Sequence, residues 1–346
     1  MGDSWYLAVE RIYIDHAREE TLNILVTGGC GFIGSNFINH RIQQYNDNIV
    51  NIDNLTYAGD INNVSHESVH VNIDLPSEGK GIYSHVQADI NHLPGFVTIG
   101  FKNYDAIVHF AAESHVDRSI DNPDEFIRTN INGTYNLLEA FKQNRSEGCQ
   151  FIHVSTDEVY GDLTEDQPAF TEESMIKPNS PYAASKASSD LICRSYHETY
   201  NLPIMITRCS NNYGPNQYPE KLVPLMIKKA MSGESLGVYG DGRNIRDWIH
   251  VSDHCRGISH VIEHGTSGEV YNLGGEHEVR NIEIVKMILD HLNMSHDLIE
   301  FVEDRKGHDW RYAMDITKAK RDLRWRPLID FQTGLEELIN QYRDAT

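Results

Sequence analysis

Three closely spaced glycines constrain the fold of this chain most strongly. Gly28, Gly31 and Gly34 come directly after an apolar run at residues 22–27 and open a segment with helical periodicity. In a dinucleotide-binding βαβ unit, the first glycine permits a tight turn and the second lets a pyrophosphate approach the backbone. The third lets the helix pack closely against the strand, and the helix N-terminus faces the phosphates. The spacing therefore predicts a nucleotide-binding turn; the alternative is a glycine turn with no such role.

The apolar runs that follow extend this prediction to a whole sheet. Residues 49–52 end in Asp53, about 20 residues after Gly34, where a carboxylate accepts a ribose 2′-hydroxyl. An acid at this position favours NAD over NADP, because it would repel a 2′-phosphate. Further runs at 84–88 and 106–110 alternate with helical segments. We therefore expect an α/β fold with a doubly wound parallel sheet of the Rossmann type.

Polar and small residues follow these further strands. Asp89 and Ile90 are placed to hold an adenine, and the small pair Ala111–Ala112 lets the backbone approach a dinucleotide. His115 and Asp117 suggest a metal, but no further ligand stands at a fixed spacing from them. We therefore expect no metal site.

A hydroxyl and two adjacent carboxylates follow the next apolar run, residues 151–154. Ligands bind at the carboxyl ends of strands in an open α/β sheet, so we expect Thr156, Asp157 and Glu158 at that edge. Neighbouring carboxylates raise each other's pKa, which suits chemistry that needs a proton donor beside a proton acceptor. The alternative is a solvated loop. Adjacent residues on a strand point to opposite faces, so both acids reach one site only if the strand ends by Thr156, as we expect.

A tyrosine and a lysine open a long helical segment that runs from residue 181 to about residue 200. Tyr182 and Lys186 are four residues apart and therefore lie on one face of the helix. A phenol with a pKa of about 10 is a poor base at neutral pH. We expect the ammonium of Lys186 to lower the pKa of Tyr182 and to bind the cofactor ribose, while the hydroxyl of Thr156 shares the same substrate oxygen. The alternative is an ordinary helix start.

The composition limits the partners. A formal net charge of −21 argues against nucleic acid or an anionic membrane as the main partner, and an anionic substrate would need a local basic cluster. Five cysteines without Cys-x-x-Cys spacing indicate reduced thiols and a cytoplasmic setting. No apolar run approaches the roughly 18 residues of a transmembrane helix.

Together these motifs resemble the extended short-chain dehydrogenase/reductase family that acts on nucleotide sugars. Within that family, the chain is similar to the dTDP-glucose 4,6-dehydratases over roughly residues 22–340. The most specific element is the Asp157–Glu158 pair, which related epimerases and decarboxylases usually lack. The segments that carry the resemblance are 54–59, 111–119, 155–161, 209–215, 218–222, 245–248 and 304–309.

The resemblance implies an NAD-dependent lyase that converts dTDP-glucose to dTDP-4-keto-6-deoxyglucose. Tyr182, aided by Thr156 and Lys186, would remove the proton of the C4 hydroxyl as a hydride passes from C4 to NAD. Glu158 would take the C5 proton, and Asp157, held protonated, would give a proton to the departing C6 hydroxyl. The hydride would then return to C6 as C5 is reprotonated, so NAD would stay bound as a catalytic cofactor.

The resemblance also implies the remaining contacts and the assembly. A homodimer is expected through the helices that begin near Pro123 and Pro181, in an enzyme of deoxysugar biosynthesis such as that of rhamnose. Four basic residues, Lys221, Arg246, Arg305 and Lys306, are expected to converge on the substrate diphosphate. The expected cofactor contacts are Gly28, Gly31, Phe32, Ile33, Gly34, Asp53, Asn54, Leu55, Thr56, Asp89, Ile90, Phe110, Ala111, Ala112, Ser114, Thr129, Tyr182, Lys186 and Asn212. The expected substrate contacts are Ser114, Thr156, Asn211, Lys221, Leu222, Val238, Tyr239, Arg246, Asn281, Asp304, Arg305 and His308.

The chain divides into three expected parts. Residues 1–21 are expected to be an N-terminal extension that is not a signal peptide, and residues 22–207 an NAD-binding domain. Residues 208–346 are expected to form mainly a smaller substrate-binding α/β lobe, interwoven with the first, that ends in a packed helix at 331–342.

A few positions depart from the family pattern. Asn54 follows Asp53 where lysine is frequent, a mild change at the cofactor rim. Gly237 stands where proline is more usual, so the loop that contacts the base is expected to be looser. The segment between Asp89 and Tyr104 looks short. The N-terminal extension is unlike the family.

Three other functions remain open. The same reaction on UDP-glucose is the nearest, because thymine and uracil differ by one methyl group, worth about 1–3 kcal/mol in a pocket. A nucleotide-sugar C4 epimerase would use Tyr182 but neither acid of the pair. A non-catalytic NAD-binding regulatory protein would not need the set formed by Thr156, Tyr182 and Lys186.

Overall fold

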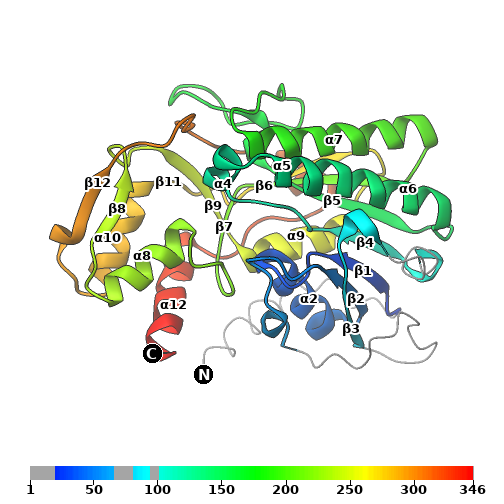
Figure 1. Cartoon of the computed structure of the whole chain (residues 1–346), viewed down its shortest axis with the longest axis horizontal. Coiled ribbons are helices and arrows are strands. Elements are labelled where there is room, and N and C mark those ends of the chain that lie inside the picture. Colours follow the sequence, from blue (N-terminus) through cyan, green and yellow to red (C-terminus); the bar gives the residue numbers. More distant parts are fainter. Residues whose placement is uncertain (1–19, 66–80, 94–100, 346) are drawn as a thin grey trace.

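The computed structural model describes residues 20–65, 81–93 and 101–345. Its centre is a seven-stranded sheet in which all neighbouring strands are parallel, so the predicted doubly wound parallel sheet is confirmed (Figure 1). The order is β10-β6-β5-β4-β1-β2-β3, which reverses direction between β1 and β4. The strands are β1 (Asn23–Thr27), β2 (Asn48–Asp53), β3 (Tyr83–Gln87), β4 (Ala106–His109), β5 (Gln150–Thr156), β6 (Ile204–Cys209) and β10 (Val270–Leu273).

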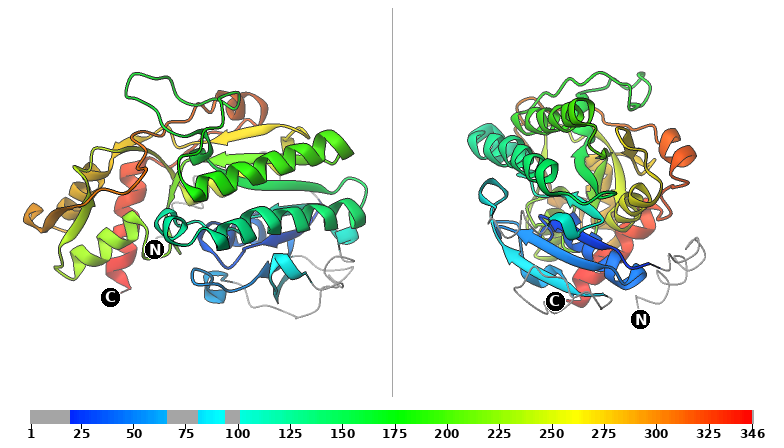
Figure 2. Two further views of the ribbon diagram at one scale, coloured as in Figure 1. Left: turned by 45° about the horizontal axis from the view of Figure 1, so that its top comes forward. Right: turned by 90° about the vertical axis from the view of Figure 1, so that its right-hand side faces the viewer.

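Helices cover both faces of this sheet, as Figure 2 shows from two further sides. On one face α6 and α7 pack over a core that includes Phe141, Phe151 and Cys193. On the other face α2 and α9 pack against each other over Ile38, Val154 and Ile258. The sheet is buried on both faces, which explains why its strands appear in the sequence as nearly continuous apolar runs. The helices are α2 (Phe32–Tyr45), α6 (Thr134–Asn144), α7 (Pro181–Tyr200) and α9 (Val251–His264). We call this sheet and its helices the first lobe.

A second lobe lies beside the first (Figure 1). It has its own core of buried apolar side chains. It contains a three-stranded sheet, β11-β9-β7, and a two-stranded parallel sheet, β12-β8. Its terminal helix buries Leu335, Leu338 and Ile339, so the predicted packed helix at the C-terminus is confirmed. The elements are β7 (Asn211–Tyr213), α8 (Leu222–Met231), β8 (Leu236–Tyr239), β9 (Ile245–His250), β11 (Glu278–Arg280), α10 (Asn281–His291), β12 (Ile299–Val302) and α12 (Phe331–Asp344).

Some segments from the second half of the chain belong to the first lobe. Helix α9 and strand β10 come after residue 207 but belong to the first lobe, where β10 is the edge strand beside β6. The helix α11 (Thr317–Asp322) contacts β10 as well. A boundary at residue 207 therefore separates the lobes only in part.

The helix predicted to begin near Pro123 is present but irregular. It consists of α5 (Asp124–Phe126), a π-helical stretch (Ile127–Gly133) and α6, in direct succession. The apolar side chain of Ile127 is 47% exposed, whereas that of the preceding Phe126 is buried. The π-helical stretch changes the helical phase between α5 and α6, which a constant period of 3.6 residues cannot predict.

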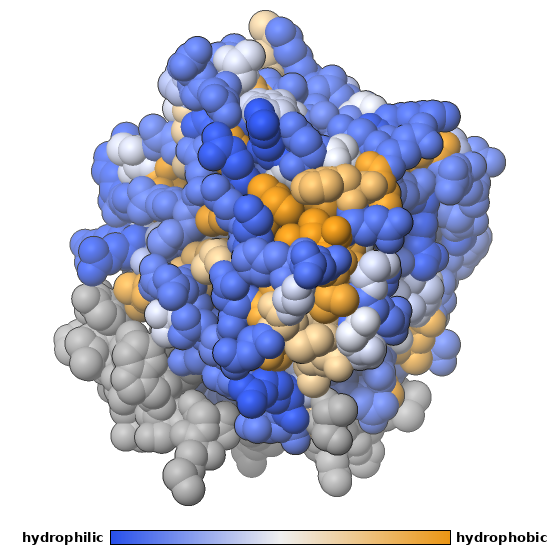
Figure 3. Space-filling view, turned by 90° about the vertical axis from the view of Figure 1, so that its left-hand side faces the viewer, coloured by the Kyte–Doolittle hydropathy of each residue, from blue (hydrophilic) through white to orange (hydrophobic). Residues whose placement is uncertain are grey.

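The remaining expectations about the fold concern the ends and the surface. No helix among the described residues is long and apolar enough to cross a membrane. The N-terminal extension lies almost wholly outside the described residues, as does half of the segment between Asp89 and Tyr104 that looked short. Gly237 lies within strand β8, opposite Glu300 of β12, and not in a loop as we expected. The outer face of the second lobe shows an apolar patch among hydrophilic residues (Figure 3).

Candidate active site

The carboxyl ends of β1, β2, β4 and β5 open into a cavity with a volume of about 340 Å³. It lies where the strand order reverses, the usual place for a ligand in an open α/β sheet. All five expected catalytic residues line it, and so do all expected cofactor contacts except Leu55. The expected residues at the cavity are Gly28, Gly31, Phe32, Ile33, Gly34, Asp53, Asn54, Thr56, Asp89, Ile90, Phe110, Ala111, Ala112, Ser114, Thr129, Thr156, Asp157, Glu158, Tyr182, Lys186, Asn211, Asn212 and Lys221.

The glycine turn after β1 forms one side of the cavity. Gly28 has a φ of +74°, and a Cβ there would lie 2.6 Å from the backbone nitrogen of Ala111. A Cβ on Gly34 would lie 2.4 Å from the carbonyl oxygen of Gly28, whereas one on Gly31 would meet nothing closer than 3.4 Å. Helix α2 then begins at Phe32 with no side-chain cap, so the N–H groups of its first turn have no protein partner from a cap. This arrangement fits an anionic pyrophosphate.

Asp53 is fixed by the backbone around it. One carboxylate oxygen accepts a hydrogen bond from the backbone N–H of Cys30 at 2.8 Å, and the other accepts one from Leu55 at 2.8 Å. The carboxylate is buried but lines the cavity, as a partner of a ribose hydroxyl would. Asp89, at the end of β3, accepts a hydrogen bond from Arg128 at 3.0 Å. We call the part of the cavity formed by Gly28–Gly34 and Asp53 the glycine-turn side.

The acid pair lies on the opposite side, where β5 ends. Strand β5 stops at Thr156 and Asp157 begins a 3₁₀ turn, so the prediction that the strand has ended before both acids is confirmed. The hydroxyl of Thr156 donates to Asp157 Oδ1 at 3.1 Å and accepts from the backbone N–H of Glu158 at 3.3 Å. Both acids consequently line the cavity. We call this part, with Lys221, the acid-pair side.

The two acids have different electrostatic surroundings. Burial raises the pKa of Asp157 well above its usual range, and the carboxylates of Glu158 and Asp247 raise it further. Asp157 Oδ2 has no hydrogen-bond partner among the described residues. Asp157 therefore favours the protonated form, with a free oxygen at the cavity.

Glu158 instead lies among cations. Burial raises its pKa too, but Lys221, Arg246 and Arg305 all act to lower it. Three of the four basic residues expected to converge therefore lie around Glu158, while Lys306 is exposed. Asp157 is thus the better proton donor of the pair and Glu158 the better acceptor.

Tyr182 and Lys186 come from the first two turns of α7. Ser180 caps this helix by accepting a hydrogen bond from the N–H of Ala183, and Pro181 occupies its first position. The ammonium of Lys186 donates to the carbonyl oxygen of Val154 at 2.8 Å. Both side chains line the cavity.

The expected effect on the tyrosine pKa is wrong for this structure. The pKa of Tyr182 is well above its usual value, because burial and then the carboxylate of Glu158 oppose the phenolate. A hydrogen bond with Thr156 acts in the opposite direction. The spacing of Tyr182 and Lys186 predicts that they share a helix face, but not how strongly burial and neighbouring acids affect the phenol.

Of the expected substrate contacts, only Ser114, Thr156, Asn211 and Lys221 line the cavity, and Lys221 donates to the carbonyl oxygen of Ser114 at 2.9 Å. Arg246 is buried behind it, where its guanidinium donates to the carbonyl oxygens of Ile245 and Asp309. The expected substrate contacts that do not line the cavity are Leu222, Val238, Tyr239, Arg246, Asn281, Asp304, Arg305 and His308.

Some of these outlying residues form a second group near the cavity. Arg305 pairs with Asp117 of α4 (Val116–Asp121) at 2.6 Å and lies over the ring of Tyr239 at 5.2 Å. His308 contacts the same ring edge-on and pairs with Asp304 at 2.6 Å. These residues belong to the second lobe except Asp117, so Arg305 connects the lobes.

Four further residues, three of which line the cavity while Arg118 contacts two of these, were not predicted as site residues. Arg118 lies 3.7 Å from the ring centroid of Tyr57 and donates to Glu220 at 2.9 Å. The ring of Tyr57 meets that of Tyr218 edge-on at 5.3 Å. We call Tyr57, Arg118, Tyr218 and Glu220 the interlobe clasp, because the first two come from the first lobe and the others from the chain before α8. All four lie in segments that carry the family resemblance, but no fixed spacing relates them.

His115 and Asp117, the pair that suggested a metal, belong to this region. His115 lies 4.0 Å from Asp117 and 3.9 Å from Glu220. Within residues 20–65, 81–93 and 101–345 no group of three or more histidines, cysteines and acids is arranged to hold a metal ion.

Comparisons with known proteins bear on the same features. The GDP-mannose 4,6 dehydratase family profile matches residues 25–338. A dTDP-glucose 4,6-dehydratase of Neisseria gonorrhoeae is 48% identical over 342 residues, covering 93% of this chain and 96% of that protein. The crystal structure of DesIV, a dTDP-glucose 4,6-dehydratase from Streptomyces venezuelae with NAD and TYD (dTDP) bound, is similar with a TM-score of 0.86 and 44% identity, covering 93% of this chain and 97% of that one.

The same fold occurs in enzymes of another kind. A UDP-glucose 4-epimerase from Thermotoga maritima, crystallised with UDP-glucose, has a TM-score of 0.82 but only 27% identity, covering 94% of this chain and 99% of that one. The fold alone therefore does not separate dehydratases from epimerases, whereas the higher identity to the dehydratases agrees with the acid pair. The chain belongs to the GDP-mannose 4,6 dehydratase family of extended short-chain dehydrogenases/reductases, within which it resembles the dTDP-glucose 4,6-dehydratases.

Proposed function

We propose that this protein is an NAD-dependent dTDP-glucose 4,6-dehydratase that forms dTDP-4-keto-6-deoxyglucose. The observation that carries the proposal is the adjacent pair Asp157–Glu158, which lines one cavity with Tyr182, Lys186 and the glycine turn. A C4 epimerase has no use for two acids beside its tyrosine. The identity of 44–48% to dTDP-glucose 4,6-dehydratases supports the same reaction.

The residues of the glycine-turn side fit NAD. The first turn of α2 would hold the pyrophosphate, and Asp53 would accept hydrogen bonds from the hydroxyls of a ribose. The free space at Gly31 agrees with a phosphate close to the backbone. When bound, NAD would supply the acceptor for the C4 hydride and the donor that returns it to C6, where C5 takes up a proton in the same reduction.

Tyr182 is proposed as the base that takes the proton of the C4 hydroxyl. A buried phenol beside carboxylates holds its proton, so it needs positive charge nearby and less negative charge from the acids. Lys186, one helical turn along α7, provides the positive charge. A proton on Asp157 removes one of the opposing negative charges. Thr156 would then share the C4 oxygen by a hydrogen bond.

The acids are proposed to carry out the elimination. Glu158, surrounded by three cations, would take the C5 proton, which the neighbouring C4 ketone acidifies. Asp157, held protonated by burial and by two neighbouring carboxylates, would give its proton to the departing C6 hydroxyl. Each such proton transfer typically supplies a factor of about 10²–10⁴ in rate.

The substrate contacts remain part of the proposal. Ser114, Asn211 and Lys221 at the cavity are proposed to hold the sugar and diphosphate, and Arg246 and Arg305 behind them to balance its charge. We propose an NAD-binding part at 22–207 and a mainly substrate-binding part at 208–346. Helix α9 and strand β10 are the exception, because they lie in the second part of the chain but belong to the first lobe.

The test is to incubate the purified protein with dTDP-glucose and UDP-glucose separately, without added NAD, and to analyse the products by mass spectrometry. We expect the dTDP sugar to lose the mass of one water molecule. Loss from the UDP sugar alone would keep the mechanism and change the substrate. An unchanged mass with a new epimer in the NMR spectrum would identify an epimerase. No product from either sugar, even with NAD added, would reject the function.

We also propose that the protein is a cytoplasmic homodimer of deoxysugar biosynthesis, such as that of rhamnose. Exposed apolar side chains gather on the neighbouring helices α5–α6 and α7, which supports pairing of these faces: Ile127 (47%), Tyr135 (48%), Leu191 (54%) and Tyr200 (49%). The five cysteines are all buried thiols. Light scattering at micromolar concentration is expected to give twice the chain mass, and a monomer there would contradict the dimer.

A further inference from the structure

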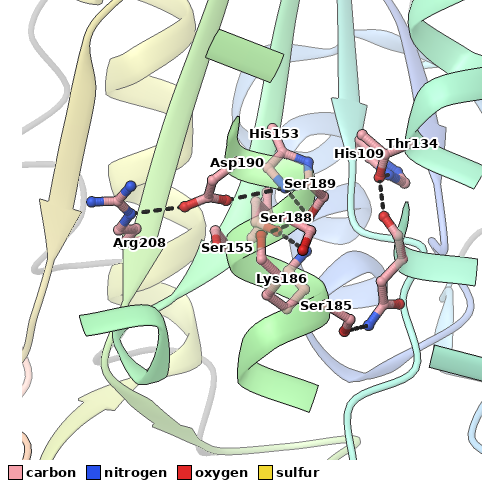
Figure 4. Close-up of polar contacts among 12 residues, drawn as sticks. His109, Thr134, His153, Ser155, Ser185, Lys186, Ser188, Ser189, Asp190 and Arg208 are labelled. Atoms are coloured by element: carbon pink, nitrogen blue, oxygen red, sulfur yellow. Dashed lines mark hydrogen bonds and ion pairs between the residues drawn. The ribbon is translucent and has the colours of Figure 1, made fainter. Parts of the chain in front are cut away.

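A buried polar network lies behind the acid-pair side of the cavity, between α7, β5 and β6 (Figure 4). Its central member is Asp190, which follows Lys186 by one helical turn on α7. Asp190 is 1% exposed and Lys186 4%, so both charges lie in the interior. Residues four apart on a helix are neighbours on its surface. Neither the family resemblance nor the proposed mechanism gives Asp190 a role.

One oxygen of the Asp190 carboxylate is held by a hydrogen bond, and the other lies near a histidine ring. Asp190 Oδ2 accepts a hydrogen bond from Arg208 Nε of β6 at 2.9 Å, and Oδ1 lies 3.4 Å from His153 Nε2 of β5 (Figure 4). His153 Nε2 also lies 3.1 Å from the hydroxyl of Ser189, which donates to the carbonyl oxygen of Lys186. The carboxylate is therefore fixed relative to the backbone of α7 at Lys186.

The ammonium of Lys186 has little compensation for its burial. Among the described residues, the hydrogen bond that it makes goes to the carbonyl oxygen of Val154, the residue after His153. Burial lowers the pKa of Lys186, and Asp190 is the strongest of the influences that raise it, ahead of the thiols of Cys193 and Cys209. A buried lysine without a nearby negative charge tends to lose its proton.

The other groups around Lys186 do not replace this charge. Burial lowers the pKa of His153 to about 4 and that of His109 well below its usual value, so both rings are neutral at pH 7. Burial raises the pKa of both thiols, which are therefore also neutral. The titratable and charged groups around Lys186 are Tyr182, Asp190 and Cys193 on α7, His109 on β4, His153 on β5, and Arg208 and Cys209 on β6.

We propose that Asp190 is a positioning residue for Lys186: its buried negative charge keeps the Lys186 ammonium charged and directed at the cavity. The inference rests on the proposed function, in which Lys186 serves Tyr182 and the cofactor ribose. Arg208 holds one oxygen of the carboxylate in place, His153 lies near the other, and Ser189 connects His153 to the carbonyl oxygen of Lys186 on α7. Asp190 itself does not line the cavity, so its proposed role is to act through Lys186 and not on a bound ligand.

Asp190 could act on Lys186, or it could serve only as the ion-pair partner of Arg208. Two variants distinguish these roles. Asp190→Asn and Arg208→Gln both break the same buried pair, but only the first removes the negative charge beside Lys186. If Asp190 served only as the partner of Arg208, the two variants would have the same effect. If it acts on Lys186, they differ in the pH at which Lys186 loses its proton.

The experiment measures two pH profiles for each variant. One is kcat/KM for dehydration of dTDP-glucose, and the other is the affinity for NAD in the absence of any sugar. In Asp190→Asn, we expect the alkaline limb of both profiles to move down by about one to two pH units, because Lys186 deprotonates sooner. In Arg208→Gln, we expect the limb to stay in place or move up. Glu198→Gln, an exposed carboxylate change on the same helix, is expected to leave both profiles unchanged.

A conservative variant and a fold check complete the test. Asp190→Glu keeps the charge but not the shape, so it should restore the alkaline limb even where it lowers the overall rate. Equal shifts in Asp190→Asn and Arg208→Gln, or no shift in either, would overturn the proposal. If Asp190→Asn does not fold by circular dichroism, a downward shift in Arg208→Gln alone would still overturn it. Failure of the unchanged protein to dehydrate the sugar while it binds NAD would reject the proposed reaction, and the NAD profile would still test Asp190.

Discussion

On the glycine-turn side of the cavity the backbone sets the geometry, whereas on the acid-pair side nearly every fixed point is a side chain. Gly28 and Gly34 must be glycines because a Cβ at either position would overlap other backbone atoms, and Asp53 is held by two backbone N–H groups. By contrast, Glu158 depends on Lys221, Arg246 and Arg305, which come from distant parts of the chain. The first side is rigid and local in sequence, and the second is electrostatic and assembled across lobes.

The largest expected effect is on the acid-pair side. Asp157→Asn and Glu158→Gln should each lower the rate of dehydration by about 10²–10⁴, because each removes one proton-transfer group. Neither change touches the glycine turn, so NAD binding and the first oxidation, measured as absorbance of the reduced cofactor, should persist. Glu173→Gln, an exposed acid of the same region, serves as the control. Dehydration at the normal rate in either acid variant would remove the acids from the mechanism.

The glycine-turn side should fail in a different manner. Gly28→Ala puts a methyl group against the backbone of Ala111 at a positive φ, so we expect a loss of about 2–5 kcal/mol in the free energy of unfolding. Gly31→Ala is the matched control, because its methyl group meets nothing closer than 3.4 Å. This second variant should keep its stability in urea but bind NAD more weakly. Equal stability of the two variants would show that close backbone contact does not define this side.

Lowering the pH should reduce the free energy of unfolding, because the buried ring of His254 resists protonation. This residue lies 2.9 Å from Asn212, which lines the cavity, and burial lowers the pKa of its ring to about 3. The unfolded chain therefore binds a proton that the folded chain refuses between about pH 6.5 and pH 3. The contribution of His254 to the free energy of unfolding is therefore fully present above about pH 6.5. It falls as the pH drops toward 3, by up to about 1.4 kcal/mol per pH unit.

Urea unfolding between pH 7 and pH 4 measures this effect. His254→Gln removes the titrating ring and should make the free energy of unfolding less dependent on pH. His296→Gln, an exposed histidine, is the control and should leave the pH dependence nearly unchanged. The same slope in the unchanged protein and in His254→Gln would contradict the prediction.

The contrast between the two sides also explains how far the sequence could predict the structure. The glycine turn, Asp53 and the Tyr182–Lys186 pair depend on short spacings, which strand and helix geometry convert directly into positions. The seven-stranded sheet follows from the same regular alternation. The end of β5 at Thr156 could be predicted because two adjacent acids can reach one site only if the strand has ended before them.

Long-range contacts set the limit of that prediction. Arg246 was expected at the diphosphate, but its guanidinium is bound by backbone carbonyls behind the cavity. The raised pKa of Tyr182 depends on burial and on Glu158, and neither is encoded by its distance from Lys186 along the chain. The π-helical stretch at Ile127–Gly133 and the interlobe clasp likewise follow no periodic pattern. These features depend on which distant segments meet.

The interlobe clasp gives the smallest expected effect and the sharpest test of the contrast. Arg118 is 47% exposed and Glu220 21%, so their ion pair contributes about 0–1 kcal/mol. Glu220→Gln should therefore speed the release of NAD by only about two- to five-fold, because one charge pair between the lobes is lost while the backbone turn remains. Exchange of bound NAD for isotopically labelled NAD, followed by mass spectrometry, measures this rate.

Salt separates the clasp from the glycine turn. Exposed charge pairs weaken as ionic strength rises, so salt should speed NAD release from the unchanged protein but have less effect on Glu220→Gln. Arg194→Gln removes a cation from an exposed pair on α7, with the Arg194 side chain 64% exposed, and should change neither rate nor salt dependence. If Glu220→Gln releases NAD as slowly as the unchanged protein at every salt concentration, the backbone of the glycine-turn side alone retains the cofactor. If NAD release is accelerated far more than the loss of an exposed ion pair can explain, the acid-pair side and the interlobe clasp hold NAD as well as the sugar.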